Sequence, residues 1–211
     1  MKKNLTRSIY IVLLFLATSC LDDITSLNTN PKAYQSGTVP AGPFFSNATR
    51  ELVDVLTDGF TFKVLAQQFA ETTYFDASSY NLTNVGNAFW VILYRDVLRD
   101  LKEAKSIVIA KPSLFEDVDN NQLALIEILE VYSYSLLVTT YGNIPYAGAI
   151  DTNLKAEGLD SDNLTPAYDD AAAIYSDLFV RLDRAISMLK PDEKAFGVAD
   201  LVYGDDLNLW I

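Results

Sequence analysis

The 211-residue chain contains no histidine and a single cysteine, Cys20. Without histidine the protein lacks the side chain that ordinarily titrates near neutral pH, and with it the commonest ligand for zinc and copper. Catalysis by a Ser-His-Asp or Cys-His arrangement is therefore excluded. A single cysteine also leaves no partner for a disulfide within the chain.

Basic residues are scarce, with 16 Lys and Arg against 28 Asp and Glu and a net charge of −12. A chain of this charge repels the phosphate backbone of nucleic acids, so we expect no nucleic-acid partner. We also predict no cofactor and no metal site. Asp117, Asp119 and Asn121 have the spacing of the first EF-hand ligands. However, Gln122 stands where that loop needs glycine, and Ile128 where it needs glutamate.

Apolar side chains, by contrast, are abundant. Half of the residues are apolar and 12% are aromatic, whereas glycine and proline number only 9 and 7. This composition is typical of a globular protein and not of a disordered one. A chain of this length is able to bury a substantial core.

The N-terminal residues have the organisation of a secretory signal. Lys2, Lys3 and Arg7 form a basic opening, and an uninterrupted apolar run follows from Ile9 to Ala17. The run is well short of the roughly 20 residues that a helix needs to cross a bilayer. We therefore predict that residues 1–19 are a signal peptide that is removed.

The predicted signal ends at Cys20, directly after the small residues Ala17 to Ser19. This arrangement resembles a lipobox, in which the cysteine receives a diacylglyceryl group before cleavage. Leu16 stands one place earlier than the usual lipobox leucine, and the alternative is an ordinary signal peptide with an incidental cysteine. Because several acyl chains on one residue give stable membrane anchoring, we predict that Cys20 is lipidated.

An acidic pair, Asp22 and Asp23, follows the cysteine. The pair resembles the export tag of surface-displayed lipoproteins in some Gram-negative bacteria; a solvated linker is the alternative. As far as Pro43 the chain is rich in Asn, Thr, Ser, Gly and Pro, which is typical of irregular structure. We predict a lipidated tether over residues 20–43 and a helical domain over residues 44–211.

Within that domain apolar residues recur at three- and four-residue spacings, which predict amphipathic helices. The third of these helices is apolar on most sides, so we expect it at the centre of the domain. Gly142 follows its last residue, as is common where a helix ends. The expected helices span roughly 46–73 with a break at Gly59, 87–111, 120–141 capped by the cluster from Asp117 to Asn121, and the stretch from beyond Pro166 to Lys190.

Long helices with short connections indicate a mainly α fold of stacked, tetratricopeptide-like helical hairpins. We expect the second helix to pair with the third. The fourth would pair with a fifth, which Asp205 or Asp206 would cap and of which the sequence holds one opening turn. If the fourth helix lacks that partner, Leu178, Leu182 and Leu189 would face water.

Several short motifs succeed one another along the chain. They are Asn30-Pro31, Ala66-Gln67-Gln68, Glu71-Thr72-Thr73-Tyr74, Phe89-Trp90, Leu93-Tyr94-Arg95-Asp96-Val97-Leu98, Tyr141-Gly142-Asn143-Ile144-Pro145-Tyr146, Pro166-Ala167-Tyr168-Asp169, Leu182-Asp183-Arg184-Ala185-Ile186 and Tyr203-Gly204-Asp205-Asp206. Each motif is common on its own, but their order is specific. In this order the chain resembles the SusD/RagB family of nutrient-binding outer-membrane lipoproteins, and its SusD-like branch in particular.

The resemblance implies an α-rich fold built on tetratricopeptide-like hairpins. It also implies a non-catalytic protein, anchored by lipid at the cell-surface face of the outer membrane, that captures an oligosaccharide or another nutrient. Its expected partner is a TonB-dependent, SusC-like outer-membrane transporter, over which it acts as a lid. Members of the family are longer than this chain, so the resemblance further implies an incomplete SusD-like fold, truncated at its C-terminus.

Sugar sites combine aromatic faces with amides and carboxylates. Side chains of these kinds gather between the first two predicted helices. We nominate Tyr74, Asp76, Tyr80 and Asn81 as ligand-binding residues. The alternative is that Tyr74 and Phe75 cover the core.

Other aromatic residues have structural interpretations. Trp90 recurs at helical spacing with apolar residues, and we expect it in the core. Tyr141 and Tyr146 flank a motif loop, and we expect them to form a helix end and a packed turn.

Two other classes of function remain open. A secreted glycoside hydrolase would use a pair of carboxylates and would need no histidine. Glu127 and Glu130 lie on one predicted helix, but their spacing is equally typical of a solvated face. A purely structural or adhesive surface lipoprotein would carry no ligand site at all.

Overall fold

The computed structural model describes residues 39–57, 59–80, 87–146 and 166–211. The predicted signal peptide, the lipidation at Cys20 and most of the predicted tether lie outside these residues, as does Asn81. Contacts between Cα atoms group Pro40–Ile211 into one structural unit, which holds every helix of the described residues.

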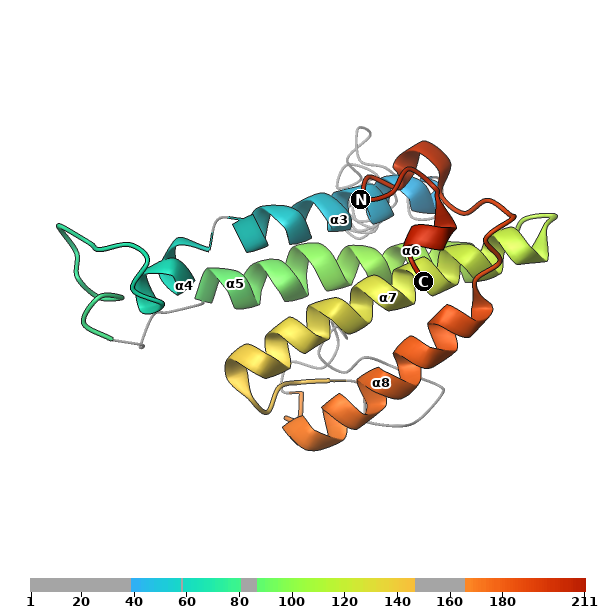
Figure 1. Cartoon of the computed structure of the whole chain (residues 1–211). Coiled ribbons are helices and arrows are strands. Elements are labelled where there is room, and N and C mark those ends of the chain that lie inside the picture. Colours follow the sequence, from blue (N-terminus) through green and yellow to red (C-terminus); the bar gives the residue numbers. More distant parts are fainter. Residues whose placement is uncertain (1–38, 58, 81–86, 147–165) are drawn as a thin grey trace, which may run out of the picture. The chain divides into compact units, whose positions relative to one another are not determined.

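The regular structure of the described residues is helical (Figure 1). The only β-type contact in these ranges is an isolated antiparallel bridge between Ile144 and Asp169, and no strand forms there. The predicted mainly α fold is confirmed. The elements are α3 (Ala41–Thr57), α4 (Phe60–Leu65), α5 (Asn87–Val91), the π-helix η1 (Ile92–Leu98), α6 (Arg99–Ala110), α7 (Glu116–Tyr141), α8 (Ala171–Met188) and the 3₁₀ turns η3 (Gly197–Ala199) and η4 (Leu207–Leu209).

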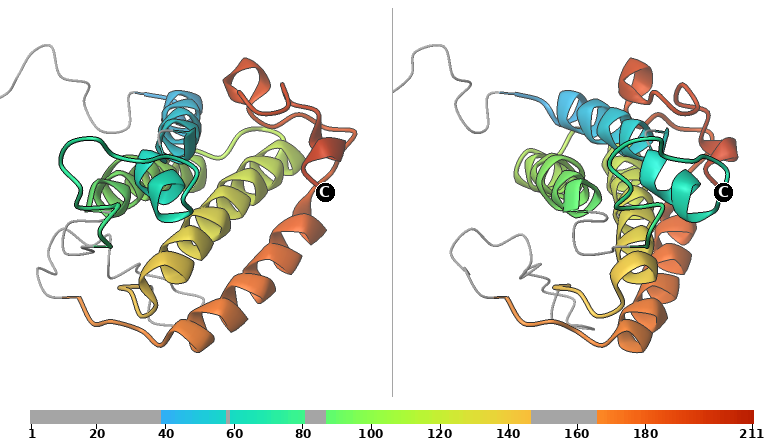
Figure 2. Two further views of the ribbon diagram at one scale, coloured as in Figure 1. Left: turned by 60° about the vertical axis from the view of Figure 1, so that its left-hand side comes forward. Right: turned by 90° about the vertical axis from the view of Figure 1, so that its left-hand side faces the viewer.

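The continuous helix made of α5, η1 and α6 forms an antiparallel hairpin with α7, as predicted (Figure 1). α3 lies against η1 and α6 on one side of this hairpin. α8 runs beside α7 along much of its length (Figure 2). The predicted pairing of the fourth helix with a fifth is not tested by these contacts and stays a prediction. The apolar residues on several sides of α7 give it packing faces for both neighbours.

α7 is the central helix because it is apolar on most sides. Leu125, Ile126 and Leu137 are fully buried. By length and composition α7 could also span a bilayer, but 61% of its most apolar stretch is buried inside the unit. The helix ends before Gly142, whose φ of 76° is a left-handed conformation that glycine adopts without strain.

The second predicted helix has the expected length but is not uniform. Its middle is η1, a π-helix, with α-helical geometry before and after it. Leu93 and Tyr94 are buried there, and the Tyr94 hydroxyl donates to the carbonyl oxygen of Pro145 over 2.6 Å. Apolar spacing could not predict the π turns, because three- and four-residue steps fit both kinds of helix.

The first predicted helix begins earlier and ends earlier than expected. α3 begins at Ala41 and not at Ser46, since Pro43 fits a first helical turn, where its missing N–H would have no partner. The Ser46 hydroxyl donates instead to the carbonyl oxygen of Ala199. The break at Gly59 is confirmed between α3 and α4.

After the break, α4 ends at Leu65, well before the predicted end at Thr73. Gln67 has a φ of 60°, which is incompatible with continuing a right-handed helix. The third predicted helix also starts earlier, because α7 begins at Glu116. The cluster from Asp117 to Asn121 therefore lies inside the helix and does not cap it. Carboxylates in the first turn still favour the helix through its dipole.

Two of the sequence motifs hold each other in place at the end of α7. The N–H of Asp169 donates to the carbonyl oxygen of Ile144 over 2.9 Å, and its carboxylate accepts the N–H of Tyr146 over 3.1 Å. The next residue, Asp170, caps α8 by accepting two backbone N–H groups. Tyr146 is fully buried, so its structural interpretation is confirmed.

Trp90 packs in the same region and is partly buried against the core. Its ring centroid lies 4.8 Å from that of Tyr94 and 5.0 Å from that of Tyr141. The prediction that Trp90 is a core residue is confirmed in this sense. Tyr141 likewise packs at the helix end, as expected.

The segment after α8 returns to α3 and to the start of α7. Asn121 is fully buried, and its side chain bonds the backbone of Lys190 and Lys194. The Phe196 ring stacks on Phe45 of α3, with 4.1 Å between the centroids. These contacts attach residues 189–211 to the core.

Two expectations for the C-terminal region have different outcomes. Asp206 caps η4 by accepting the N–H of Asn208, so the predicted cap and opening turn are confirmed. Leu178 and Leu189 do not face water, since they are 3% and 6% exposed, and Leu182 is partly buried against the core, because α7 packs against α8. The large apolar residues that α8 does expose are Tyr175, Phe179 and Val180.

Candidate functional site

The first candidate site is a group of exposed aromatic residues beyond the end of α3 (Figure 1). It comprises α4 and the loop that follows, residues 60–80, which we call the aromatic arm. Large aromatic side chains are usually buried, so a concentration of exposed rings in a short segment indicates a binding surface. The exposed rings of the arm are Phe60, Phe62, Phe69, Tyr74, Phe75 and Tyr80.

Internal hydrogen bonds hold the loop of the arm together. The Glu71 carboxylate accepts the N–H and the hydroxyl of Ser78, both over 2.9 Å. The Gln67 amide donates to the Tyr80 hydroxyl over 3.0 Å. Ala77 is buried inside the loop at 7% exposure. Hydrogen bonds within the loop therefore hold its backbone in the conformation that exposes these rings.

The backbone of the arm contains unusual conformations. Gln67, Tyr74 and Tyr80 have φ values of 60°, 62° and 57°, although none of them is glycine. A left-handed conformation costs a non-glycine residue about 1–2 kcal/mol. Such costs tend to be retained where a side chain must be held in a functional position. Two of these residues belong to the predicted ligand site.

The arm brings together much of what the sequence predicted for a ligand site. Tyr74 is 86% exposed and Tyr80 is 55% exposed, and Asp76 is exposed in the same loop. Asn81 lies outside the described residues. The alternative that Tyr74 and Phe75 cover the core is wrong, because Phe75 is also 57% exposed.

Sequence reasoning did not nominate Phe60, Phe62 or Phe69, three of the four phenylalanines of the arm. Phe69 falls within the first predicted helix, 46–73, but α4 ends before it. Phe60 and Phe69 instead stack, with 6.2 Å between their centroids. Chemically, exposed ring faces beside a carboxylate and amides suit the apolar faces and hydroxyl groups of a sugar.

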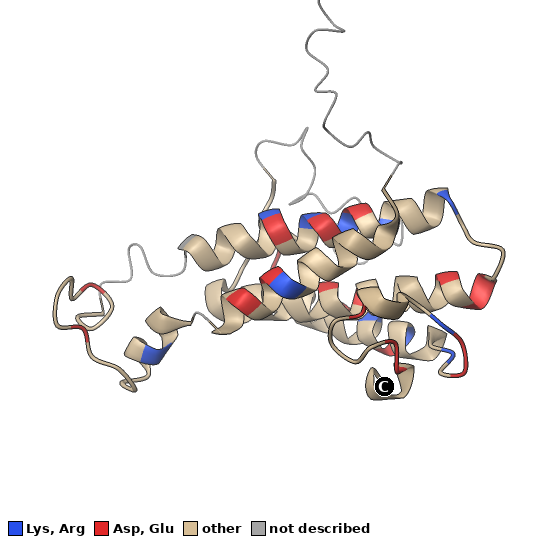
Figure 3. Cartoon of the chain, turned by 90° about the horizontal axis from the view of Figure 1, so that it is seen from above, with Lys and Arg blue, Asp and Glu red and all other residues tan. Residues whose placement is uncertain are grey.

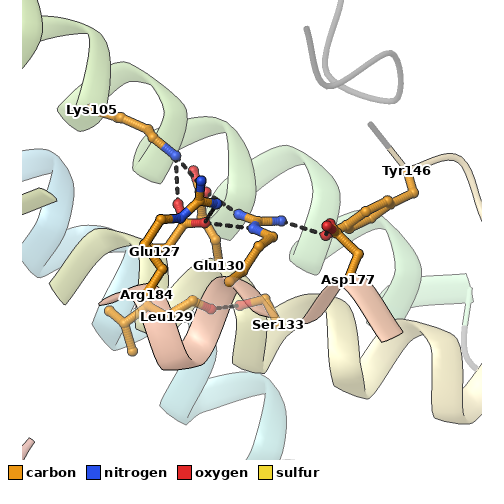
Figure 4. Close-up of polar contacts among 9 residues, drawn as sticks. Lys105, Glu127, Leu129, Glu130, Ser133, Tyr146, Asp177 and Arg184 are labelled. Carbon is orange, nitrogen blue, oxygen red and sulfur yellow. Dashed lines mark hydrogen bonds and ion pairs between the residues drawn. The ribbon is translucent and has the colours of Figure 1, made fainter. Parts of the chain in front are cut away.

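A second feature is a buried group of charged side chains between α6, α7 and α8 (Figure 4). Arg181 is 3% exposed and donates to Glu127 over 2.6 Å and to Glu130 over 2.7 Å. Lys105 reaches the same two carboxylates over 2.7 and 3.1 Å. We call these four residues the charge cluster. Its two cations and two carboxylates balance, as burial requires.

Tyr146 connects the charge cluster to the motif loop after α7. Arg181 donates from Nη1 to the Tyr146 hydroxyl over 2.7 Å, and this hydroxyl donates to Asp177 over 2.7 Å (Figure 4). Burial raises the pKa of Tyr146 above its ordinary value, so the hydroxyl keeps its proton. Arg181 therefore fixes the position of this loop as well as the packing of α8.

Burial and charge oppose each other at the carboxylates. Burial disfavours the ionised form of Glu127, but hydrogen bonds and charges from Arg181 and Lys105 outweigh it and lower its pKa to about 2. Glu130 is more completely enclosed, and this burial raises its pKa. For Arg181 the burial is outweighed by both glutamates, which raise its pKa further above its ordinary range.

The lowered pKa of Glu127 predicts an acid-dependent loss of stability. Its pKa is 4.5 ordinarily and about 2 in the fold, so its contribution is fully present above about pH 4.5 and is lost as the pH falls towards 2. A Glu127→Gln variant is expected to lose on the order of 3 kcal/mol of unfolding free energy at neutral pH. Urea unfolding at about pH 7, 4 and 3 measures this loss, which should shrink with acidification. A loss that is independent of pH would contradict the assignment.

The carboxylate pair of the cluster does not have the environment of a glycosidase pair. Glu127 and Glu130 are 8% and 6% exposed, so the expectation of a solvated face is wrong: α8 covers them and supplies Arg181. A catalytic acid and nucleophile must flank a glycosidic bond in an accessible cleft. These two carboxylates are occupied by cations instead.

A third feature is a groove of about 540 Å³, which we call the apolar groove. The hydroxyls of Thr49 and Ser135 in its lining donate to backbone carbonyl oxygens, and the Trp210 indole N–H donates to the Asp200 carboxylate. It is lined by Thr49, Leu52, Val53 and Leu56 of α3, by Ile128, Leu129, Val131, Tyr132 and Ser135 of α7, by Tyr175, Leu178, Phe179 and Leu182 of α8, and by Val202, Tyr203, Leu209 and Trp210.

Among the residues that the structure describes, no group of three or more Cys, Asp or Glu side chains is arranged to hold a metal ion. The aromatic arm, with exposed rings beside Asp76, has the chemistry of a candidate sugar site.

Comparison with known protein families gives a match that covers nearly all of the described residues. Residues 31–211 match the SusD-like family that is described as starch-binding and associating with the outer membrane. The matched range includes the aromatic arm, the charge cluster and the apolar groove. No curated protein matches the chain.

Proposed function

The chain belongs to the SusD-like family, and we propose that it is a surface-exposed outer-membrane lipoprotein that binds a glycan or another nutrient. Membership implies a starch- or glycan-binding protein associated with the outer membrane, in a family of generally non-catalytic binding proteins. We further propose that Cys20 carries the lipid and that the protein works with a TonB-dependent, SusC-like transporter.

The aromatic arm is the observation that carries the binding function. Its loop exposes Tyr74 and Phe75 almost side by side, with Asp76 next to them. In the proposed site these rings cover the apolar faces of sugar units, and Asp76 accepts hydrogen bonds from their hydroxyl groups. Tyr80, whose hydroxyl is bonded to Gln67, supports the other end of the loop.

The anchoring and the partner rest on the N-terminal sequence and on the family. A basic and apolar signal followed by small residues and Cys20 supports lipidation. Outer-membrane association of the family supports the location. A lid over a transporter would deliver the captured nutrient directly to the pore, so binding alone suffices and no catalytic group is required.

Electrophoresis in native gels with and without soluble starch tests the binding function. The protein used is residues 21–211, which contain the whole of the described core. We expect retardation in the starch gel and no new reducing ends after incubation with starch. Release of reducing ends would instead establish a hydrolase. Equal mobility in both gels would remove starch as the ligand of the arm.

A further inference from the structure

The aromatic arm carries three charged side chains, and their surroundings bear on which glycans it can hold. They are Lys63 in α4 and Glu71 and Asp76 in the loop, one cation against two carboxylates. Figure 3 shows the basic position in α4 and the acidic positions along the loop. A ligand that lies on the exposed rings meets those charges that are not already engaged within the protein.

Two of the three charges are engaged within the protein. The Lys63 ammonium donates to the carbonyl oxygen of Thr57 over 3.2 Å and lies 5.9 Å from the centroid of the Phe69 ring. The Glu71 carboxylate accepts the N–H and the hydroxyl of Ser78. Both groups therefore stabilise the structure of the arm and are less available to a ligand.

Asp76 is the charged group of the arm that a ligand meets directly. Its side chain is exposed, and among the described residues it makes no hydrogen bond or ion pair. It follows Tyr74 and Phe75 in the chain, whose rings are 86% and 57% exposed. An ionised carboxylate only accepts hydrogen bonds, so it requires a ligand that donates them.

A carboxylate in this position favours one kind of glycan and repels another. The hydroxyl groups of an uncharged sugar can all donate to it. An acidic sugar unit brings a second carboxylate, which has no proton to donate at neutral pH and repels the first. Sites for anionic ligands commonly use Arg or Lys side chains, and the single cation of the arm is already bonded to Thr57. The net charge of −12 on the whole chain adds to the repulsion.

We propose that the aromatic arm selects its ligand by charge: it takes glycans of uncharged units and rejects glycans that carry carboxylate groups. Asp76 is the residue that determines this selectivity. The inference rests on the proposed function, because it concerns the ligand class of the same site. It goes further, since binding of starch alone does not distinguish a site that tolerates acidic units from one that excludes them.

Native gels that contain either soluble starch or carboxymethyl starch test the proposal, again with residues 21–211. The two polymers have the same α-glucan backbone and differ in their carboxylate groups. We expect the affinity of the wild type for carboxymethyl starch to be at least about fivefold lower than for starch. In Asp76→Asn this ratio should move about fivefold towards carboxymethyl starch, because the amide carries no charge and can donate.

The matched control is Asp192→Asn in the turn after α8. Asp192 is also exposed and makes no hydrogen bond or ion pair among the described residues. Its replacement changes the net charge by the same amount as Asp76→Asn, and the wild-type preference for starch should remain. Circular dichroism and urea unfolding establish that both variants keep the fold.

Three results would overturn the inference, and they separate it from the proposed function. Equal retardation of the wild type by both polymers, or stronger retardation by carboxymethyl starch, contradicts the charge selection and leaves glycan binding in place. Equal shifts for Asp76→Asn and Asp192→Asn would assign the preference to the charge of the whole chain. Retardation by neither polymer would remove starch as the ligand of the arm, and the selectivity with it.

Discussion

Replacing Arg181 with methionine is expected to lower the free energy of unfolding by about 3–5 kcal/mol. The guanidinium is 3% exposed and bonds Glu127, Glu130 and the Tyr146 hydroxyl. Methionine fills a similar volume but leaves two buried carboxylates, Glu127 and Glu130, with Lys105 as the one remaining cation of the charge cluster. Urea unfolding at neutral pH, followed by circular dichroism, measures the difference.

The control for this variant is Arg184→Met on the same helix. Arg184 is 47% exposed and lies 3.9 Å from Glu127, so it is a solvated ion pair of the kind that contributes less than about 1 kcal/mol. A small change for Arg184→Met beside a large one for Arg181→Met would identify burial as the cause. Similar small changes for both would show that the charge cluster contributes little to the fold.

Replacing Tyr74 with alanine is expected to weaken starch binding about tenfold, which corresponds to the 1–1.5 kcal/mol of one aromatic contact. The side chain is 86% exposed and supports no packing, so its loss should affect the ligand and not the fold. The relative mobility of the variant in gels of increasing starch content gives the change in affinity.

Phe115→Ala provides the matched control for the arm. Phe115 is a 69% exposed ring at the α6–α7 turn, at the other end of the helices from the arm (Figure 1). This substitution should leave starch binding unchanged. If Tyr74→Ala and Phe115→Ala behave alike, the binding surface lies elsewhere and the nomination of Tyr74 is wrong.

The helices could be predicted because their signals are local. Apolar residues at helical spacing predicted the hairpin and the central position of α7, and Gly142 correctly indicated where that helix ends. Helix boundaries were less predictable, because residue types that cap helices also occur inside them. Ser46 and the Asp117 to Asn121 cluster are capping residue types, but the structure places them inside helices.

The charge cluster could not be predicted, because its contacts join distant parts of the chain. Glu127 and Glu130 lie 54 and 51 positions from Arg181, and no local pattern pairs them. On one helix alone their spacing is that of a solvated face. Only the packing of α8 against α7 turns these carboxylates inward and makes them dependent on Arg181.

The aromatic arm lies between these two cases. Tyr74, Asp76 and Tyr80 could be nominated because ring and polar side chains gather in one segment. Their exposure depends on α4 ending early, and that end depends on left-handed conformations at residues that are not glycine. Such conformations have no sequence signature of the kind that glycine gives a turn.

The proposed role is tested most directly by capturing the native protein from detergent-solubilised outer membranes, measuring its intact mass and identifying the proteins that co-purify. We expect a polypeptide that begins at Cys20, is heavier than its amino-acid sequence by the mass of its acyl chains, and is bound to a large TonB-dependent barrel protein. An unmodified protein without a partner in the periplasmic fraction would contradict both the lipid anchor and the transporter partnership.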